Sequence, residues 1–417
     1  MDGEKAEPDR ADATNQLCTS LAIKCKLFPM RVLVDCTQIT RNKAGVGVYA
    51  LNLIRGLRKH QQQKDLELWI LVQSDDPDFS FEEDGTHIVT IQSRWFRSLP
   101  LRLLMEQIYI PWLLRKHKID VLHSLHYSFP LLRTRARKVV TICDMTSFIM
   151  PEVHVPVKIA YFHFFIRAGS YLSDALIFIS TSTQKDWKHY FPKSSKPGFV
   201  VPLGKALSFH PNIDPSEIDA VVRKYGLTRP YVLYIGTIEP RKNIARLIRA
   251  FAQLAEQFPS ASLVITGMKG WGYAEVFDTV KSLNIESRVI FTGFADEDDK
   301  PQLLAGAEVF VYPSLYEGFG IPVLEALACG TPTVTSAISS IPEVAGDAAL
   351  LVNPESITEI AEQLARLLDS SELRDSLRAL ALKQAALFTW ERTASETLGV
   401  YRTVESWKSS KSGQTKE

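Results

Sequence analysis

The sequence predicts an α/β protein built from two doubly wound, Rossmann-like domains, each with a parallel sheet covered by helices. Its 417 residues are too many for one ordinary hydrophobic core. Two successive sets of short apolar runs alternate with amphipathic helical patterns, and each set covers just under half of the chain. Between the sets, residues 199–212 break the pattern with proline, glycine and serine, which indicates a linker.

The composition is that of a soluble globular protein, with 46% hydrophobic and 23% charged residues. A net charge of +1 provides no bulk attraction to nucleic acid. The five cysteines are odd in number and form no C-x-x-C pair, which favours reduced thiols in the cytosol. No signal peptide or membrane-spanning apolar run is evident. We therefore expect a cytoplasmic protein, soluble or peripheral at most, with no nucleic-acid partner.

The first set of elements begins at Met30, after a polar stretch (residues 1–29) that we expect to be a disordered extension. Its first strand leads through a glycine loop into an amphipathic helix. The patterns predict strands at 30–39, 66–73, 87–93, 121–126 and 138–144, the glycine loop and its helix within 41–60, and helices at 99–120 and 157–174. Residues 175–187 read as a strand, a turn and a helix in succession.

The second set repeats the alternation of strands and helices. It predicts strands at 230–236, 262–267, 288–293, 309–314 and 331–336, with helices between them. The expected boundaries are 30–205 for the N-terminal domain, 206–385 for the C-terminal domain, 386–404 for a final helix and 405–417 for a disordered tail.

The segment YEGFGIPVLEALACGTPTVTS, residues 316–336, carries the most chemistry. Pro322 suits the first turn of a helix, Gly330 suits its end, and strands on both sides complete a βαβ unit. Ligands of such sheets bind at the carboxyl ends of strands, where Glu317, Gly318, Phe319 and Gly320 are expected.

Three features of this segment suit a nucleotide sugar. Free amides at the helix start favour a pyrophosphate, and the glycines allow close approach. Glu317 would face the ligand from the loop, and the carboxylate of Glu325 can accept two hydrogen bonds from a ribose diol. An ordinary βαβ turn, with glutamates that are solvated or cap the helix, remains open from this segment alone.

Other candidates lie at the expected ends of other strands. Arg241 and Lys242, in GTIEPRKN, could hold phosphates, or they could be surface bases at a helix start. Gly45 and Gly47 open a helix but lack the full G-x-G-x-x-G fingerprint. His126 is a candidate in HSLHYSF, although a single histidine is more often structural.

The strand end TICD supplies Cys143 and Asp144 to the same region. A cysteine in such an apolar strand is more often a small buried hydrophobe than a nucleophile. Two acidic clusters, 74–78 and 296–300, contain a D-x-D spacing that could bind a metal–nucleotide complex. Such runs are also ordinary turn chemistry, and two nearby cations make a metal unnecessary, so we predict no metal site.

These residues resemble the large family of retaining, nucleotide-sugar-dependent glycosyltransferases with the GT-B fold (family 4), above all its bacterial mannosyltransferases of surface-polysaccharide synthesis. The resemblance covers about residues 30–403. It rests on AGVGVYALNLIRGL, HSLHYSFPL, VLYIGTIEPRKNIARLIRAF, LVITGMKGWG, VIFTGF, VYPSLYEGFGIPVLEALACGTPTVTS and SSIPEVAGDAALLVNP. The E-x7-E spacing together with GTIEPRKN is its most specific part.

The resemblance implies two facing domains with an interdomain cleft, the acceptor on the N-terminal domain and the donor nucleotide on the C-terminal one. The final helix would cross back to the N-terminal domain. For the transferred sugar, the resemblance implies a contact with Glu317, and the amides of Gly318, Phe319 and Gly320 would contact both sugar and phosphate. For the diphosphate, it implies contacts with Arg241 and Lys242, with Gly47 on the far side of the diphosphate. Glu325 would bind the ribose, and Phe294 would lie near the base.

The implied chemistry retains the anomeric configuration, with fixed positive charge in place of a metal at the leaving phosphate. The GTIEPRKN and GMKGWG variants favour GDP-mannose as co-substrate, with no other cofactor, and a glycan or lipid-linked glycan as acceptor. Two alternatives stay open: a glucosyl- or other hexosyltransferase using a UDP- or ADP-sugar, and a weakly active homologue that only binds a nucleotide sugar.

One position departs from the family pattern. The family commonly has histidine where Cys143 stands, and that histidine contacts the donor sugar near the reacting carbon. The cysteine implies either an altered donor preference or a partial replacement of that role by His126.

Residues 94–138 form a basic segment, with ten Lys or Arg residues against two acids. Trp95, Phe96 and Trp112 are interleaved with them. This combination predicts peripheral contact with an anionic membrane, at the inner face of the cytoplasmic membrane. The alternative is a solvated basic face over an ordinary buried helix.

Overall fold

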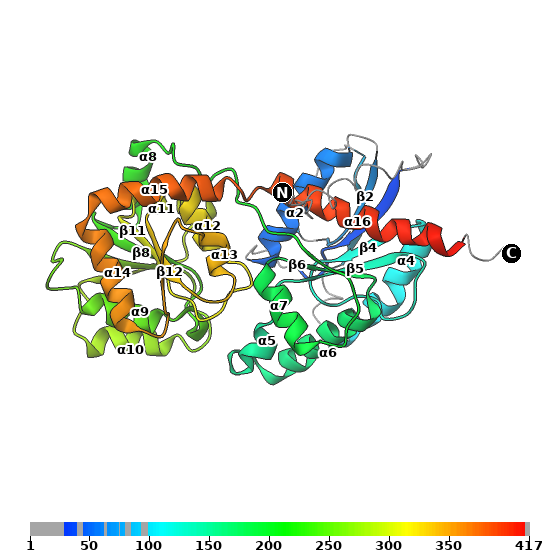
Figure 1. The fold of residues 1–417 in the computed structure, drawn as a ribbon, viewed down its shortest axis with the longest axis horizontal. Helices are drawn as coiled ribbons and strands as arrows, with labels where there is room; N and C mark the ends of the chain where they lie inside the picture. Colours follow the sequence, from blue (N-terminus) through cyan, green and yellow to red (C-terminus); the bar gives the residue numbers. More distant parts are fainter. Residues whose placement is uncertain are drawn as a thin grey trace, which may run out of the picture.

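The computed structural model describes residues 29–39, 45–61, 65–74, 76–79, 85–92 and 99–412. Two α/β domains lie side by side, with the N-terminal domain at the right of Figure 1 and the C-terminal domain at the left. The predicted fold class is confirmed, since each domain has one parallel sheet with helices on both faces. All but one residue of the predicted extension, and residues 413–417 of the predicted tail, lie outside the described residues.

The N-terminal sheet has the strand order β3-β2-β1-β4-β5-β6-β7, and every pair is parallel. Its strands are β1 (Met30–Asp35), β2 (Leu66–Gln73), β3 (His87–Ile91), β4 (Val121–Ser124), β5 (Arg137–Ile142), β6 (Ala175–Phe178) and β7 (Gly198–Val200). Its helical segments are α2 (Val46–Gln61), η1 (Pro77–Phe79), α3 (Leu99–Leu104), the π-helical turn η3 (Met105–Tyr109), α4 (Ile110–Lys116), α5 (Thr146–Ile149), η4 (Pro151–Val153), α6 (Pro156–Leu172) and α7 (Thr181–Tyr190).

The C-terminal sheet repeats this winding with the order β10-β9-β8-β11-β12-β13. Its strands are β8 (Tyr231–Ile235), β9 (Ser262–Thr266), β10 (Val289–Gly293), β11 (Val309–Tyr312), β12 (Thr333–Ser336) and β13 (Leu350–Val352). Its helical segments are α8 (Pro215–Lys224), η5 (Pro240–Lys242), α9 (Ile244–Ala252), α10 (Ala274–Ser282), η6 (Glu297–Asp299), α11 (Lys300–Gly306), α12 (Ile321–Ala328), α13 (Ile341–Ala345), α14 (Ile357–Asp369) and α15 (Ser371–Ala385).

Three boundaries differ from the sequence predictions. Strand β7 occupies the start of the segment predicted to be a linker, and β13 matches no predicted strand. The final helix, α16 (Trp390–Ser412), begins later and runs further than 386–404, so part of the predicted tail is helical. Strands β7 and β13 were missed because each has only three residues, too few to form a recognisable apolar run.

Helix α16 returns from the C-terminal domain and lies along the N-terminal domain beside α2 (Figure 1). Its contact with α2 is close, because a Cβ at Gly56 would lie 2.6 Å from the Cβ of Ala394. Tyr401 reaches the interior, where its hydroxyl lies 2.6 Å from Nδ1 of the fully buried His123. The chain thus ties its two domains together at both the linker and this helix.

Candidate active site

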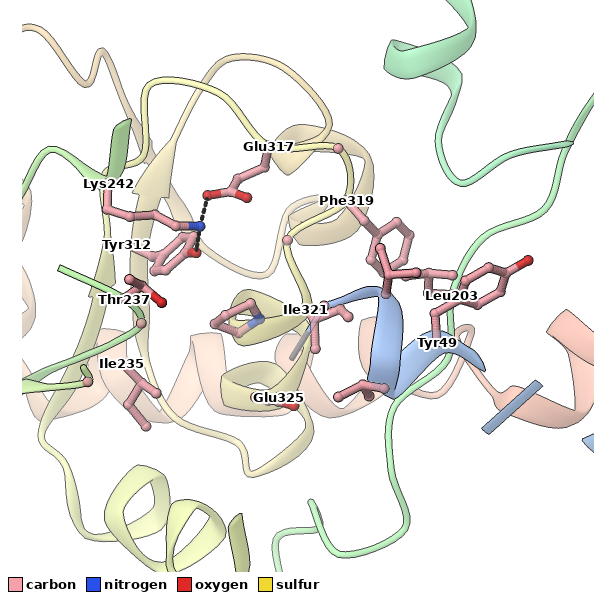
Figure 2. A pocket seen from close by; sticks show the side chains of 18 of the residues that line it. Tyr49, Leu203, Ile235, Thr237, Lys242, Tyr312, Glu317, Phe319, Ile321 and Glu325 are labelled. Carbon is pink, nitrogen blue, oxygen red and sulfur yellow. Dashed lines mark hydrogen bonds and ion pairs between the residues drawn. The ribbon is translucent and has the colours of Figure 1, made fainter. Parts of the chain in front are cut away.

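A cleft of about 970 Å³ separates the two sheets at the carboxyl ends of their strands. The N-terminal wall comes from the start of α2 and the end of β5, including Tyr49 and Asp144. The C-terminal wall comes from the ends of β8, β9 and β11 and from α12. Figure 2 shows Lys242 and Glu317 on one side of this space, Tyr49 on the other and Glu325 between them.

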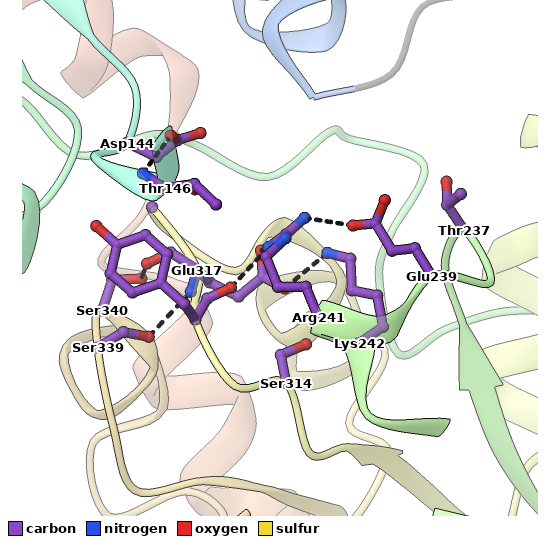
Figure 3. A network of polar contacts seen from close by, with 12 residues as sticks. Asp144, Thr146, Thr237, Glu239, Arg241, Lys242, Ser314, Glu317, Ser339 and Ser340 are labelled. Carbon is purple, nitrogen blue, oxygen red and sulfur yellow. Dashed lines mark hydrogen bonds and ion pairs between the residues drawn. The ribbon is translucent and has the colours of Figure 1, made fainter. Parts of the chain in front are cut away.

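A charged cluster forms the C-terminal wall. Lys242 lies in η5 after β8, and its Nζ is 2.6 Å from Oε1 of Glu317 in the loop after β11. The same Nζ donates to the hydroxyl of Tyr312 at 2.7 Å. Arg241 lies 3.0 Å from the other oxygen of Glu317 and 2.8 Å from Glu239. Strands β8 and β11 are neighbours, which is why these two loops meet (Figure 3).

The cluster is buried, and its charges depend on one another. Burial would raise the pKa of Glu317, but Arg241 and Lys242 outweigh it and hold that pKa at about 2. Burial lowers the pKa of Lys242, and the carboxylate of Glu317 opposes this. For Arg241, Glu317 and Glu239 outweigh burial and raise the pKa. The cluster therefore holds two cations against two carboxylates, where an incoming diphosphate could compete for the cations.

Two serines fix the backbone at Glu317. The amide N–H of Glu317 donates to Oγ of Ser339 at 3.1 Å, and Oγ of Ser340 donates to its carbonyl at 2.8 Å (Figure 3). Ser339 has a left-handed backbone, with φ of 56°. Neither serine was singled out from the sequence, although both lie in the motif SSIPEVAG. The short loop before α13 thus holds the backbone of Glu317 in place.

The glycines in the loop after β11 allow close contact between the two domains, in addition to the ligand access that the sequence predicted. A Cβ at Gly318 would lie 2.1 Å from the carbonyl oxygen of Cys143 in the other domain, so only glycine fits there. Gly320 has φ of 105°, a conformation that favours glycine, and it leads into α12 with Pro322 in the first turn as predicted. The side chain of Phe319 is buried and meets Phe388 edge to face.

Polar contacts across the cleft hold the domains in this arrangement. The carboxylate of Glu343 accepts from the first amides of α7, at 2.8 Å from Thr181 and 2.5 Å from Ser182. The hydroxyl of Tyr316 donates to Asp186 of α7 at 2.8 Å. A helix N-terminus and a facing carboxylate attract each other, so the C-terminal domain caps a helix of the N-terminal one.

Glu325 and Phe294 also line the cleft, outside the charged cluster. Glu325 projects from α12 into the cleft, and burial raises its pKa to about 8, with only partial compensation from Lys300. Phe294, after β10, is 57% exposed and lines the same cleft. An exposed aromatic ring beside an acid that lacks a cation partner matches the requirements of a base and a ribose.

Known proteins agree with this geometry. A family model described as Glycosyl transferases group 1 matches residues 217–384, and one described as Glycosyltransferase Family 4 matches residues 44–207. Over 382 residues the chain is 29% identical to the O-antigen chain mannosyltransferase B of Escherichia coli, covering 89% of this chain and all of that one. The chain is a glycosyltransferase. Its predicted family resemblance is thereby confirmed.

Two further similarities bear on this glycosyltransferase. It is 35% identical over 203 residues to the serotype-specific mannosyltransferase WbdA of Escherichia coli, which covers 48% of this chain and 25% of that longer protein. The structure of Anabaena HepE in complex with UDP and glucose superposes with a TM-score of 0.70, at 18% identity, over 90% of this chain and all of that one. At that identity the second likeness establishes the GT-B fold alone.

Two predicted site residues of the glycosyltransferase lie away from the cleft surface. Gly47 faces the buried side of the first turn of α2, whereas its neighbours Gly45, Val46 and Val48 line the cleft. His126 is also absent from the lining, although the hydroxyl of its neighbour Tyr127 donates to the carbonyl of Asp144, which does line the cleft. The predicted contact of His126 with the donor sugar stays a prediction.

The acidic clusters of the glycosyltransferase show no metal-like arrangement where they are described. Asp296 and Asp299 bind Lys224, at 2.9 and 2.6 Å. Asp75 of the first cluster lies outside the described residues. Among the residues that the structure places, no three His, Cys, Asp or Glu side chains converge as a metal site would require. Metal independence itself stays a prediction.

Cys143→Ser should leave turnover of the glycosyltransferase within a few-fold of wild type. The thiol is buried, donates to the carbonyl of Leu125 at 3.7 Å, and has a pKa that burial raises far above its usual range. A thiol held protonated is a poor nucleophile. Steady-state kinetics with equal amounts of folded protein would test this, and a loss of several hundred-fold would show that the position is chemical.

Proposed function

We propose that this glycosyltransferase transfers mannose from GDP-mannose to a glycan or lipid-linked glycan in cell-surface polysaccharide synthesis, with retention of configuration and without a metal. The observation that carries the proposal is the buried Lys242–Glu317–Arg241 cluster at the end of an otherwise uncharged Gly loop. The 29% identity to an O-antigen mannosyltransferase over nearly the whole chain supports the choice of sugar and acceptor class.

We assign two parts of the donor to groups that line the cleft. The diphosphate would meet Arg241 and Lys242, and the ribose hydroxyls would donate to Glu325. In the transfer, the acceptor oxygen forms a bond to the anomeric carbon while the bond between that carbon and the diphosphate oxygen breaks. The bonding electron pair passes to the diphosphate, and so does the hydroxyl proton. The growing negative charge lies beside two fixed cations, which is the basis for proposing a metal-free reaction.

An ion pair that lines the cleft supports guanine as the base of the donor. Glu297 and Lys300 both line the cleft and form an ion pair at 2.5 Å. The Watson–Crick edge of guanine presents N–H donors beside a carbonyl acceptor, so one carboxylate and one ammonium group complement it. Uracil lacks the exocyclic amine that would give the carboxylate a second donor. This pair therefore supports GDP as the nucleotide.

A thermal-shift screen of GDP-, UDP-, ADP- and dTDP-sugars, followed by a transfer assay in excess EDTA, tests the proposal. GDP-mannose should stabilise the protein most and should turn over in the presence of the chelator. A larger shift with UDP-glucose would favour a glucosyltransferase. If EDTA abolished turnover and Mg²⁺ or Mn²⁺ restored it, the metal-free mechanism would be wrong and the D-x-D clusters would become the leading metal candidates.

Donor binding should depend on pH through Glu325. Its pKa of about 8 means that the carboxyl group is mostly protonated at pH 7 in the empty protein. Ribose hydroxyls donate to the ionised form, so binding should release a proton and affinity should increase from pH 6 to about 8. Titration calorimetry in buffers of different ionisation enthalpy would measure that proton, and Glu325→Gln should abolish the pH slope. A flat profile in the wild type would contradict the ribose role.

Peripheral membrane contact is supported by a smaller surface than the sequence predicted. Lys138 is buried and donates to backbone carbonyls, and Arg102 and Arg137 pair with carboxylates inside the domain. Residues 94–97 lie outside the described residues. The exposed basic residues are Arg115, Lys116, Lys118, Arg133 and Arg135. The segment also exposes the apolar side chains Leu104, Ile108 and Trp112, spaced four residues apart, and the ammonium group of Lys116 lies over the Trp112 ring.

We expect salt-sensitive binding to vesicles that contain anionic lipid, and weaker binding to neutral vesicles. Ile108→Ser with Trp112→Ser should reduce the bound fraction severalfold, because it removes the apolar anchor while keeping the charges. Sedimentation with vesicles would measure it. Equal binding to neutral vesicles, or none at low salt, would refute this surface. No helix among the described residues is long and apolar enough to cross a bilayer.

A further inference from the structure

A π-helical turn places a carboxylate inside the N-terminal domain. Glu106 lies in η3 and has no exposed surface. Its Oε1 accepts from Nε of Arg102 at 3.1 Å, Nε2 of Gln38 at 3.0 Å and Oγ of Ser128 at 2.9 Å. Its Oε2 has no hydrogen-bond partner in the part of the chain that the structure describes. π-helical turns are frequent at functional sites, and a buried carboxylate with one unpartnered oxygen is costly unless it has a role.

Through Gln38, this carboxylate fixes the proton of His126. The amide nitrogen of Gln38 donates to Glu106, so its oxygen is the atom 2.7 Å from Nδ1 of His126. Because an amide oxygen only accepts, Nδ1 carries the proton and Nε2 keeps its lone pair. Burial and then Arg102 lower the pKa of His126 to about 4, against the opposing charge of Asp144, so the ring is neutral at physiological pH.

His126 lies where a doubly wound sheet offers a ligand site. It follows β4, Gln38 follows β1, and these neighbouring strands mark the point where the strand order reverses. The next residue, Tyr127, has φ of 48°, a strained conformation for tyrosine, and its hydroxyl donates to the carbonyl of Asp144 on the cleft wall at 3.4 Å. His126 is half-buried, and its Nε2 has no partner among the described residues.

We propose that Glu106 and Gln38 are positioning residues that hold His126 with a free Nε2, and that this nitrogen accepts a hydrogen bond from a hydroxyl of the acceptor other than the one that attacks. The inference rests on the proposed transfer to a hydroxyl acceptor and deepens it. Because the cleft lining includes Asp144 but not His126, we assign the contact of Nε2 to the acceptor rather than to the donor. A neutral ring that accepts at Nε2 would hold the acceptor so that its attacking hydroxyl faces the anomeric carbon in the cleft.

The tautomer can be measured without any activity. In protein labelled with ¹⁵N-histidine, two-bond ¹H–¹⁵N correlation spectra distinguish Nδ1–H from Nε2–H, and His126→Asn identifies the signal. The wild type should show Nδ1–H at His126 from pH 6 to 8. Glu106→Gln offers Gln38 a donor, so the amide of Gln38 can turn and His126 should shift toward Nε2–H. An unchanged tautomer in this variant would overturn the positioning role.

Kinetics test the contact with the acceptor. Gln38→Leu removes the partner of Nδ1, and we expect kcat for transfer to fall about a hundredfold, because a misplacement of the acceptor by about 1 Å can slow transfer by that factor. The Kd for GDP-mannose should change less than twofold. Tyr401→Phe is the matched control, because it removes an equally short bond to the neighbouring buried His123. It should lower the melting temperature without changing kcat.

The outcomes separate this inference from the proposed function. Equal losses of kcat in Gln38→Leu and Tyr401→Phe would show that both networks only support the fold, which would overturn the inference. A weaker Kd for GDP-mannose in Gln38→Leu, with kcat unchanged, would place His126 on the donor instead and would also overturn it. Absence of transfer by the wild type with every nucleotide sugar would refute the proposed function, and the tautomer measurement would still decide the positioning role.

Discussion

Replacing Lys242 with alanine should lower kcat about a hundred- to a thousandfold, while donor KM rises far less. Negative charge grows on the leaving diphosphate oxygen as the glycosidic bond breaks, so a fixed ammonium group stabilises the transition state more than bound donor. Losing one such preorganised contact typically costs about 3–4 kcal/mol. Steady-state kinetics with GDP-mannose would give both parameters.

Two variants calibrate this result. Lys224→Ala removes an exposed ammonium group that also binds two carboxylates but lies outside the cleft, and it should leave kcat unchanged. Because the proposed role of Glu325 is to bind the ribose, Glu325→Ala should raise KM and leave kcat nearly intact. If Lys242→Ala raised KM with kcat unchanged, the lysine would bind the ground state and transition state equally, and the proposed role in bond cleavage would be wrong.

The fold class was predictable because both sheets are parallel and covered on both faces. Strands such as β1 and β8 are buried almost throughout and read as continuous apolar runs. The edge strands β7 and β13 were not predicted, since three residues carry no periodicity. Helix α16 ended beyond its predicted limit because its last turns are polar and give no hydrophobic repeat.

The candidate site was predictable as a set of strand ends but not as a set of contacts. Motifs placed Arg241, Lys242 and Glu317 in two loops after apolar strands. That these loops meet depends on β8 and β11 being neighbours in the sheet, and periodicity does not reveal strand order. The ion pairs could therefore be identified only from the structure. The same holds for the hydrogen bond that Lys242 donates to the hydroxyl of Tyr312.

The count of charges along the sequence overestimated the basic surface, because the sequence does not reveal which side chains contact one another in the fold. Arg137 and Lys138 belong to β5, and Arg102 points inward to the carboxylate of Glu106. A count over a segment cannot separate a cation that faces solvent from one that closes a buried network. The same network was missed because Gln38 and Glu106 are 68 positions apart and no motif joins them.

Glu317→Gln should move donor-site binding and turnover in opposite directions. In the wild type the carboxylate neutralises Lys242 and Arg241, at 2.6 and 3.0 Å. The amide raises the charge of the site by one, so GDP should bind about tenfold more tightly. Transfer should nevertheless fall about a hundred- to a thousandfold. Positive charge develops on the sugar in the transition state, and the neutral amide would no longer stabilise it as the carboxylate does.

The same substitution should also make the stability of the protein depend more strongly on bound nucleotide. Two buried cations would lose a partner, and breaking a buried pair typically costs about 3–5 kcal/mol, so the empty variant should melt well below the wild type. GDP supplies the missing anion and should restore most of the difference. Calorimetry for GDP affinity, scanning calorimetry for stability and a transfer assay give three readouts. If affinity and turnover fell together, Glu317 would be a structural partner of the cations rather than a group that faces the sugar.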